Sequence, residues 1–130
     1  MTADLLDKEL HALARFHPTA SMVRAEDGQP RIRMLVPSKE HAGVAYEVVG
    51  VYPPDYPASA VRFYVVNYDI PEGCPHLYSD GSLCLDHTSA FSPRSTAATA
   101  LAWVVVWLYC LDKWLSSGCR VNIWDTYLKA

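Results

Sequence analysis

Near the middle of the chain, one cysteine lies among side chains that can move protons. Leucines flank Cys84 on both sides, and they can anchor its backbone in a core while the sulfur stays at the rim. His76, Asp86 and His87 stand close to it in sequence, and each can hydrogen-bond or exchange a proton. Asp80-Gly81 supplies a turn that puts this stretch of the chain in place, because glycine tolerates a positive φ. A thiol in such surroundings favours nucleophilic chemistry over the role of a small core side chain.

The length and composition of the chain limit what can surround this cysteine. With 130 residues we expect one domain, 1–130, and 51% hydrophobic residues against 19% charged ones predict a packed core. The net charge is −3 and no stretch is rich in Lys or Arg, so nucleic acid is not expected as a partner. The acidic start of the chain does not fit a signal peptide. We therefore expect a cytoplasmic protein whose four cysteines are reduced thiols.

The elements that must position the cysteine follow from the hydrophobic pattern. Apolar residues at helical spacing predict a helix over residues 3–16, which Thr2 caps and His17-Pro18 ends. Alternating apolar residues then predict four strands, and Asp27-Gly28 marks the hairpin turn between the first two. The expected strands are 20–25, 30–36, 44–52 and 61–68. The fold class is therefore α/β, more narrowly α+β: a helix followed by a four-stranded antiparallel meander.

The cysteine itself belongs to a long connection between the sheet and a second helix. Residues 67–91 show little regular structure, and ordered loops of this length are usually functional. The second helix is expected over 93–115, with Ser92 at its N-cap and Ser116-Ser117-Gly118 at its end. Its residues 100–111 include no polar side chain, but this run is too short to span a bilayer, so no membrane partner is expected.

One stripe of this central helix is rich in tryptophan. Its members are Trp103, Trp107 and Trp114, whose numbers differ by four and seven. We expect these three side chains to pack against one layer of the fold. Other apolar residues of the helix should then meet a partner or the C-terminal segment.

Four segments, in the same order along the chain, resemble the ubiquitin-conjugating enzyme family. The family's His-Pro-Asn, seven residues and catalytic Cys-Leu correspond to Cys74-Pro75-His76, seven residues and Cys84-Leu85. Its upstream Tyr-Pro-x-x-Pro-Pro and the strand that follows are similar to Tyr52-Pro53-Pro54-Asp55-Tyr56-Pro57 and Val61-Arg62-Phe63. Its downstream Trp-Ser-Pro corresponds to Phe91-Ser92-Pro93. The resemblance spans roughly residues 3–116 and implies the family's fold, with an active-site loop before the central helix.

Where the sequence departs from the general family pattern, it resembles the bacterial members of the family. These carry Pro-His-x-Tyr-x-Asp-Gly-x-Leu-Cys-Leu before a tryptophan-rich helix, as residues 75–85 do here. Such members occur in anti-phage operons, either of the short type of cyclic-oligonucleotide signalling or of ubiquitin-like modification. Residues 119–130 leave no room for the family's two C-terminal helices, so the resemblance implies a fold with truncated C-terminal helices.

What the resemblance implies is acyl transfer by a cysteine. Cys84 would accept the activated C-terminus of a protein as a thioester and pass it to an amine on a target protein, without a cofactor. The cargo would be a cyclic-nucleotide synthase (a nucleotidyltransferase) or a ubiquitin-like protein, according to the operon. The sequence contains no nucleotide-binding loop, so an activating enzyme or another source must activate the acyl group. The family's first helix contacts that enzyme and is commonly basic, whereas here it carries Asp4, Asp7 and Glu9.

Further residues are candidates for the site. His76 stands at the position of the family's asparagine, where it could donate a hydrogen bond to the oxyanion, take a proton from the amine or brace the loop; the donor role is favoured. Asp86 matches an acidic position two residues after the family's cysteine and could hold the incoming amine, or be a solvated carboxylate. Tyr78 could line the cleft, and Asp80 belongs to the turn beside it.

Two other interpretations stay open. Cys74, His76, Cys84 and His87 could together bind zinc, since all four side chains are plausible ligands for it. Against this, the spacing of the first pair is short, and the resemblance to conjugating enzymes already accounts for the loop. Cys74 is expected to be a buried thiol. The chain could also be a non-catalytic variant that binds ubiquitin-like proteins, although relatives of that kind typically lack the cysteine.

Overall fold

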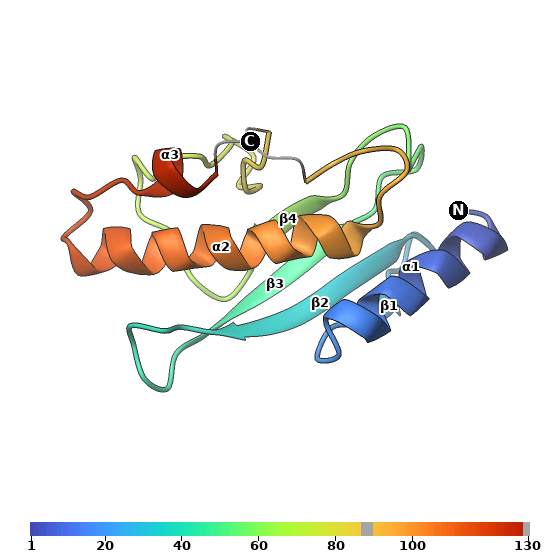
Figure 1. Ribbon diagram of the computed structural model, residues 1–130, viewed down its shortest axis with the longest axis horizontal. Helices are drawn as coiled ribbons and strands as arrows, with labels where there is room; N and C mark the ends of the chain where they lie inside the picture. The colour runs from blue at the N-terminus through green and yellow to red at the C-terminus, as the bar shows by residue number, and fades with distance from the viewer. Residues whose placement is uncertain (87–89, 129–130) are drawn as a thin grey trace.

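A helix, a four-stranded sheet and two further helices follow one another along the chain (Figure 1). The computed structural model describes residues 1–86 and 90–128. In chain order the elements are α1 (Ala3–Phe16), β1 (Ser21–Arg24), β2 (Pro30–Pro37), β3 (Ala45–Val51), β4 (Arg62–Val65), α2 (Ala97–Ser116) and α3 (Trp124–Tyr127). The strands pair antiparallel in the order β1-β2-β3-β4, and α1 and α2 contact each other on one face of this sheet. The α+β architecture expected from the sequence is confirmed.

Glu9 of α1 holds three parts of the fold together from inside the core. Its side chain is fully buried, and its carboxylate accepts hydrogen bonds from the hydroxyls of Tyr52 (2.6 Å) and Tyr56 (3.0 Å). It also accepts from the backbone N–H of Ala97 (2.9 Å). Burial and the neighbouring carboxylate raise the pKa of both tyrosines, so both remain protonated donors. Glu9 is therefore a buried residue. It does not belong with the exposed acidic residues Asp4 and Asp7 beside which it stands in the sequence.

The central helix α2 begins later than its sequence indicated. Its first residue is Ala97 rather than Pro93, because Ser92 opens a separate turn in which the N–H of Ser95 donates to Ser92 O (3.0 Å). The N-cap residue of the helix, Thr96, makes no side-chain cap bond. Instead, the carboxylate of Glu9 caps the helix, because it accepts a hydrogen bond from the first helical N–H. A cap supplied by a distant helix leaves no local signal in the sequence.

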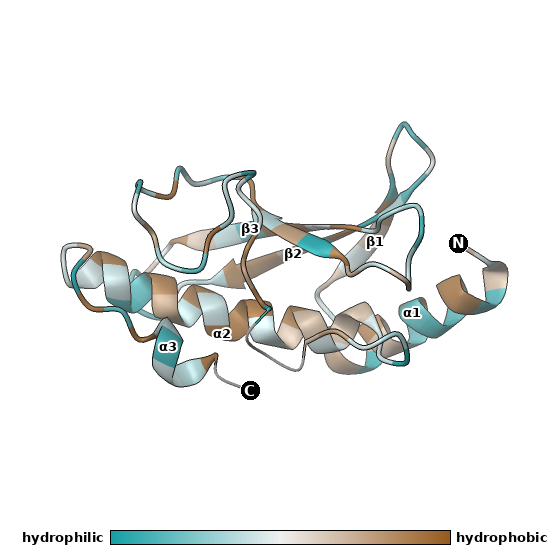
Figure 2. Cartoon of the chain, turned by 90° about the horizontal axis from the view of Figure 1, so that it is seen from above, coloured by the Kyte–Doolittle hydropathy of each residue, from teal (hydrophilic) through white to brown (hydrophobic). Residues whose placement is uncertain are grey.

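The burial and the end of α2 agree with the sequence. The helix ends at Ser116, and Gly118 follows with φ 69°. By length and composition alone α2 could cross a membrane, but more than half of its apolar window is buried inside this fold, as in the core helix of a compact domain. Figure 2 shows the hydrophobic colour along much of α2. Its most buried apolar side chains are Leu101, Val104, Trp107, Leu108 and Leu111.

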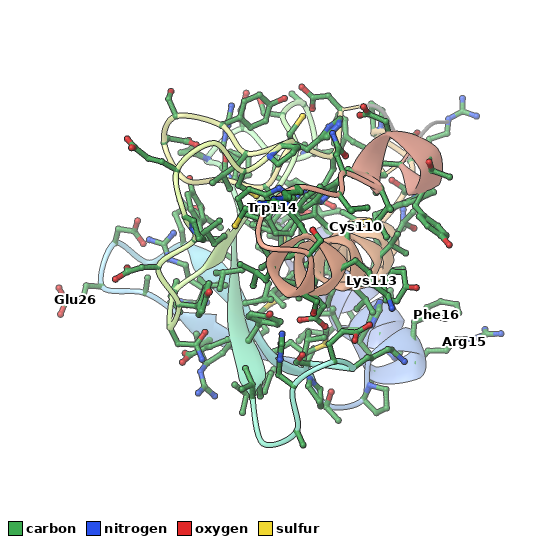
Figure 3. The ribbon with its side chains drawn as sticks, turned by 90° about the vertical axis from the view of Figure 1, so that its left-hand side faces the viewer. Arg15, Phe16, Glu26, Cys110, Lys113 and Trp114 are labelled. Atoms are coloured by element: carbon green, nitrogen blue, oxygen red, sulfur yellow. The ribbon has the colours of Figure 1, made fainter. Side chains whose placement is uncertain are left out.

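Two tryptophans of α2 pack against the C-terminal helix α3. Trp107 and Trp114 are buried and pack against Trp124, with ring centroids 5.3 and 6.0 Å apart. Figure 3 shows Trp114 directed from α2 into the interior. Trp103 is half-buried. The tryptophan stripe itself thus meets the C-terminal segment, a contact that the sequence pattern assigned to other apolar residues of the helix.

The fourth strand is shorter than expected, because a side chain takes over its pairing. β4 covers Arg62–Val65 rather than 61–68. Beyond it, Asn67 Oδ1 accepts from Glu47 N and Asn67 Nδ2 donates to Ala45 O, both at 2.8 Å. The amide satisfies the edge of β3 in place of backbone groups. The backbone can therefore leave the sheet early and enter the long loop that leads to the candidate cysteine.

Candidate active site

A small hairpin carries the candidate nucleophile. The N–H of Tyr78 donates to Ser82 O (2.9 Å), and Gly81, with φ 89°, makes the turn between them. Further from the turn, the N–H of Cys84 donates to His76 O (2.9 Å). This pairing places the backbone of His76 opposite that of Cys84. The two residues that the sequence proposed as catalytic are therefore neighbours.

Leu83 fixes the hairpin to the sheet and leaves the thiol near the surface. Its side chain is 5% exposed, and its N–H donates to Phe63 O of β4 (2.9 Å). Successive side chains of an extended segment point to opposite sides, so Cys84 points away from the core side that Leu83 occupies. Cys84 keeps 8% exposure, and Leu85 is half-buried. Leu83 thus anchors the backbone, and Cys84 is a buried residue rather than one at an open rim.

Tyr78 brings a hydroxyl to the sulfur. Its O–H donates to Asp86 Oδ2, and hydrogen bonds with Asp86 and then with Cys84 raise the pKa of Tyr78. The guanidinium carbon of Arg62 lies 5.9 Å from the centroid of the tyrosine ring. Tyr78 therefore stays a protonated donor between a carboxylate and the candidate nucleophile. The sequence indicated only that this ring could line the cleft.

His76 is held by its backbone, its carbonyl oxygen and its ring. Its φ of 54° is a left-handed conformation, uncommon for a residue with a side chain. Its carbonyl oxygen accepts from the N–H of Cys84 and from the indole N–H of Trp107, both at 2.9 Å. Its ring Nε2 lies 2.6 Å from Oδ1 of Asp125 in α3. A strained backbone conformation that the surrounding contacts hold in place is typical of functional sites.

Asp80 belongs to the turn of the hairpin. Its carboxylate accepts from Ser82 Oγ (2.6 Å) and from Ser82 N (2.9 Å), and these bonds lower its pKa. The guanidinium of Arg62 also lies 3.6 Å from it. The sequence placed Asp80 beside the site, and the contacts of its carboxylate shape the loop that presents Cys84.

The other buried thiols are poor nucleophiles. Burial, followed by the neighbouring Cys119, raises the pKa of Cys74 to about 12. Burial raises the pKa of Cys110 to about 11. Because the thiolate is the nucleophilic form, both remain unreactive near neutral pH. Cys74 is half-buried, whereas the sequence indicated a buried thiol.

The zinc interpretation finds no support in the described residues. Within 1–86 and 90–128, no three His, Cys, Asp or Glu side chains form a group that could hold a metal ion. The ring of His76 directs Nε2 to Asp125. His87, the fourth ligand of that interpretation, lies outside the described residues.

A groove of about 520 Å³ lies along the hairpin. Residues on both sides of Cys84 line it, namely Leu83, Leu85 and Asp86, together with Tyr78. Across from them it is lined by further residues, which include Pro53, Arg62 and Phe91. Apolar walls with a few hydrogen-bonding groups are typical of binding sites. Cys84 itself is not among the residues that line the groove.

Comparisons with known proteins identify the family and the fold of the chain. Residues 9–124 match the model of the E2-CBASS family, described as "Type II CBASS E2 protein". Among solved structures, a Plasmodium vivax ubiquitin conjugating enzyme E2 is 19% identical with a TM-score of 0.57, and the match covers 79% of this chain and 97% of that one. The Vps23 UEV, solved in a complex with ubiquitin, is 15% identical with a TM-score of 0.53, over 78% of this chain and 79% of that one. The comparison with curated proteins gives no match.

The two structural matches establish the ubiquitin-conjugating fold that the sequence resemblance implied. Their low identities carry the fold alone. The family match shows the family as well as the fold, because it covers most of the chain, from within α1 to the start of α3. It gives the protein a conjugating-enzyme-like role in CBASS, the cyclic-oligonucleotide type of anti-phage defence, and the chain belongs to the family of type II CBASS E2 proteins.

Proposed function

We propose that Cys84 carries the activated C-terminus of a cargo protein as a thioester and transfers it to an amine. The position of Cys84 supports this function. Its thiol stands beside the hydroxyl of Tyr78, between residues that line the groove, and opposite the firmly held His76. The buried thiols of Cys74 and Cys110 keep their protons near neutral pH, so they cannot compete for the acyl group.

The reaction has two steps at the same carbon. In loading, the thiolate of Cys84 attacks the activated carbonyl, the C–S bond forms and the activating group leaves. In discharge, an amine nitrogen attacks, the C–N bond forms, the nitrogen loses a proton and the electrons of the C–S bond return to sulfur. Both steps pass through a tetrahedral oxyanion, which gains most from a donor that is already in place. The Tyr78 hydroxyl donates its one proton to Asp86 in the resting protein, so it becomes this donor when it turns to the oxyanion, and the Asp86 carboxylate then suits an approaching ammonium group.

The groove and the family suggest the cargo. The groove is lined by the residues on both sides of Cys84 but not by Cys84 itself, so the proposed C-terminal tail of the cargo lies in the groove and must leave it at its last residue to reach the thiol. Because the family acts in CBASS, the cargo we propose is the C-terminus of the cyclic-nucleotide synthase, with an amine of a target protein as acceptor. A ubiquitin-like protein is the other cargo that the family resemblance implies. The acyl group reaches the protein already activated, by an activating enzyme or another source.

Loading onto cysteine variants tests this function. The purified protein is incubated with the C-terminal peptide of the candidate synthase, supplied as a 2-mercaptoethanesulfonate thioester, and adducts are separated on non-reducing gels. Cys84→Ala should abolish the adduct, whereas Cys74→Ala, Cys110→Ala and Cys119→Ala should keep it. Cys84→Ser should give an oxyester that survives reducing agent and breaks in hydroxide. An adduct that persists in Cys84→Ala would rule out this mechanism.

A second candidate function is non-catalytic binding of a ubiquitin-like protein. The low exposure of the Cys84 thiol favours it, and one of the structures with this fold is a UEV in a complex with ubiquitin. A binding protein of this kind would form no covalent adduct. It would also bind a ubiquitin-like protein equally well as wild type and as Cys84→Ala. Calorimetric titration of both proteins, beside the gel assay, separates this function from acyl transfer.

A further inference from the structure

The short helix α3 is packed onto the same tryptophan that holds the hairpin of the site. Trp124 is fully buried, and its ring centroid lies 5.3 Å from that of Trp107. The indole N–H of Trp107 in turn donates to His76 O (2.9 Å). Figure 1 shows α3 next to the loop that contains residues 74–86. One side chain of α2 therefore fixes α3 and His76 relative to each other.

This packing brings the carboxylate of Asp125 onto the ring of His76. Oδ1 of Asp125 lies 2.6 Å from Nε2 of His76, whose side chain is 14% exposed. Asn122 helps to orient the carboxylate: its Nδ2 lies 3.5 Å from the other oxygen of Asp125, and its Oδ1 accepts from the N–H of Trp124 (3.0 Å). An ionised carboxylate can only accept hydrogen bonds, so this contact requires a proton on Nε2.

We propose that Asp125 is a positioning residue for the transfer reaction, because it keeps the proton of neutral His76 on Nε2 and makes Nδ1 the proton-exchanging ring atom of a residue whose backbone pairs with that of Cys84. This inference rests on the proposed acyl transfer at Cys84. A neutral ring with its proton on Nε2 accepts at Nδ1 and cannot donate there. Neutral His76 therefore does not supply the hydrogen bond to the oxyanion that the sequence favoured. It is arranged as a base instead.

The discharge step can then be written with both roles filled. A neutral amine attacks the thioester carbon, the C–N bond forms and a proton passes from that nitrogen to Nδ1 of His76. The C–S bond breaks and its electrons return to Cys84 as the thiolate, which recovers the proton from the imidazolium. Asp125 stabilises the imidazolium while it exists, as the carboxylate does in a Ser-His-Asp site. The O–H of Tyr78 turns from Asp86 to the oxyanion, so donor and base are different side chains.

Two changes at Asp125 distinguish positioning from a merely structural contact. Asp125→Asn keeps the shape of the side chain, but its amide can present either oxygen or nitrogen to the ring and no longer dictates the tautomer. Asp125→Ala removes the contact altogether. Thr126→Ala, an exposed neighbour on the same helix, is the matched control. A thermal melt of each variant reports the fold, which Trp124 anchors independently of Asp125.

The first readout needs no cargo. Long-range ¹H–¹⁵N correlation spectra of the protein alone, at mildly alkaline pH, identify which ring nitrogen of His76 carries the proton. We expect the Nε2-protonated form in wild type and Thr126→Ala, and a mixture of the two forms in Asp125→Asn. A wild-type ring with its proton on Nδ1, or an unchanged tautomer in Asp125→Asn, overturns the inference whether or not acyl transfer occurs.

The second readout is the rate of discharge. Cys84 is loaded with a fluorescent peptide from its 2-mercaptoethanesulfonate thioester, and single-turnover transfer to lysine is followed. A positioned base contributes about 10²–10⁴ in rate, and we expect Asp125→Asn and Asp125→Ala to lose about 10- to 100-fold of it while loading stays close to wild type. If folded Asp125→Asn and Asp125→Ala discharge as fast as wild type, the inference is overturned and the proposed function still stands. A wild type that never loads defeats the proposed function instead, and Asp125→Asn alone decides the rate if Asp125→Ala does not fold.

Discussion

Replacing Glu9 should show how much of the fold behind the site depends on one buried carboxylate. Glu9→Ala removes the acceptor of three buried donors, the hydroxyls of Tyr52 and Tyr56 and the N–H of Ala97. A buried donor without a partner costs about 1–3 kcal/mol, so three of them give about 3–9 kcal/mol. We expect Glu9→Ala to lower the free energy of unfolding by about 4 kcal/mol.

Glu9→Gln is the matched variant, because it keeps the shape and removes only the charge. The amide oxygen can take the place of Oε1, which accepts from Tyr52 and Ala97. The amide nitrogen then faces Tyr56, whose hydroxyl can turn and accept from it. Charge-assisted bonds become neutral ones, which are roughly half as strong. We therefore expect a loss of about 1–2 kcal/mol, clearly smaller than that of Glu9→Ala.

Urea denaturation followed by tryptophan fluorescence measures both losses, since the buried tryptophans report the packing of α2 and α3. Asp7→Ala, exposed on the same helix, is the control and should change the free energy of unfolding by less than about 0.5 kcal/mol. Equal losses in Glu9→Ala and Glu9→Gln would refute the reasoning. So would a Glu9→Ala protein within about 1 kcal/mol of wild type, because the three donors would then not depend on the carboxylate.

Two further changes concern the thiols and the hydroxyl beside them. Tyr78→Phe removes only the O–H that meets Asp86 and Cys84, so it should slow discharge about 10²-fold and leave the melting temperature unchanged; a rate within about twofold of wild type would speak against Tyr78 as the donor. Cys74 and Cys110, whose pKa values are raised to about 12 and about 11, hold their protons to higher pH than free cysteine. Brief treatment of the native protein with iodoacetamide at about pH 8 should therefore leave both unmodified by peptide mass analysis, and alkylation of either as fast as free cysteine would show that the site is open.

Local signals predicted the elements of the fold, and contacts from distant segments moved their ends. The turn at Asp27-Gly28 and the stop at Gly118 depend on glycine, so the sequence shows them directly. The start of α2 depends on Glu9, which is 88 residues from Ala97 in the chain. The end of β4 depends on an amide side chain, Asn67, that replaces strand pairing. Neither contact has a pattern that periodicity or capping rules detect.

The candidate site divides in the same way. Asp80-Gly81 predicted the turn beside Cys84, but not the hairpin pairing around it, which brings the backbone of His76 opposite the cysteine. Asp125 could not be predicted, because it is 49 residues from His76 in the chain and lies in a segment with no motif. The sequence offered one signal for the position of His76. A buried tryptophan usually finds an acceptor for its indole N–H, and Trp107 donates to the carbonyl oxygen of His76.

The central claim is a thioester on Cys84, and the mass of the intact protein tests it most directly. Wild type is exposed briefly to a peptide supplied as its 2-mercaptoethanesulfonate thioester, and the acylated residue is located by digestion. The account predicts one acyl adduct per chain, on the peptide that contains Cys84, which neutral hydroxylamine removes. A protein that gains no mass, or an adduct that sits on another residue or resists hydroxylamine, would contradict it.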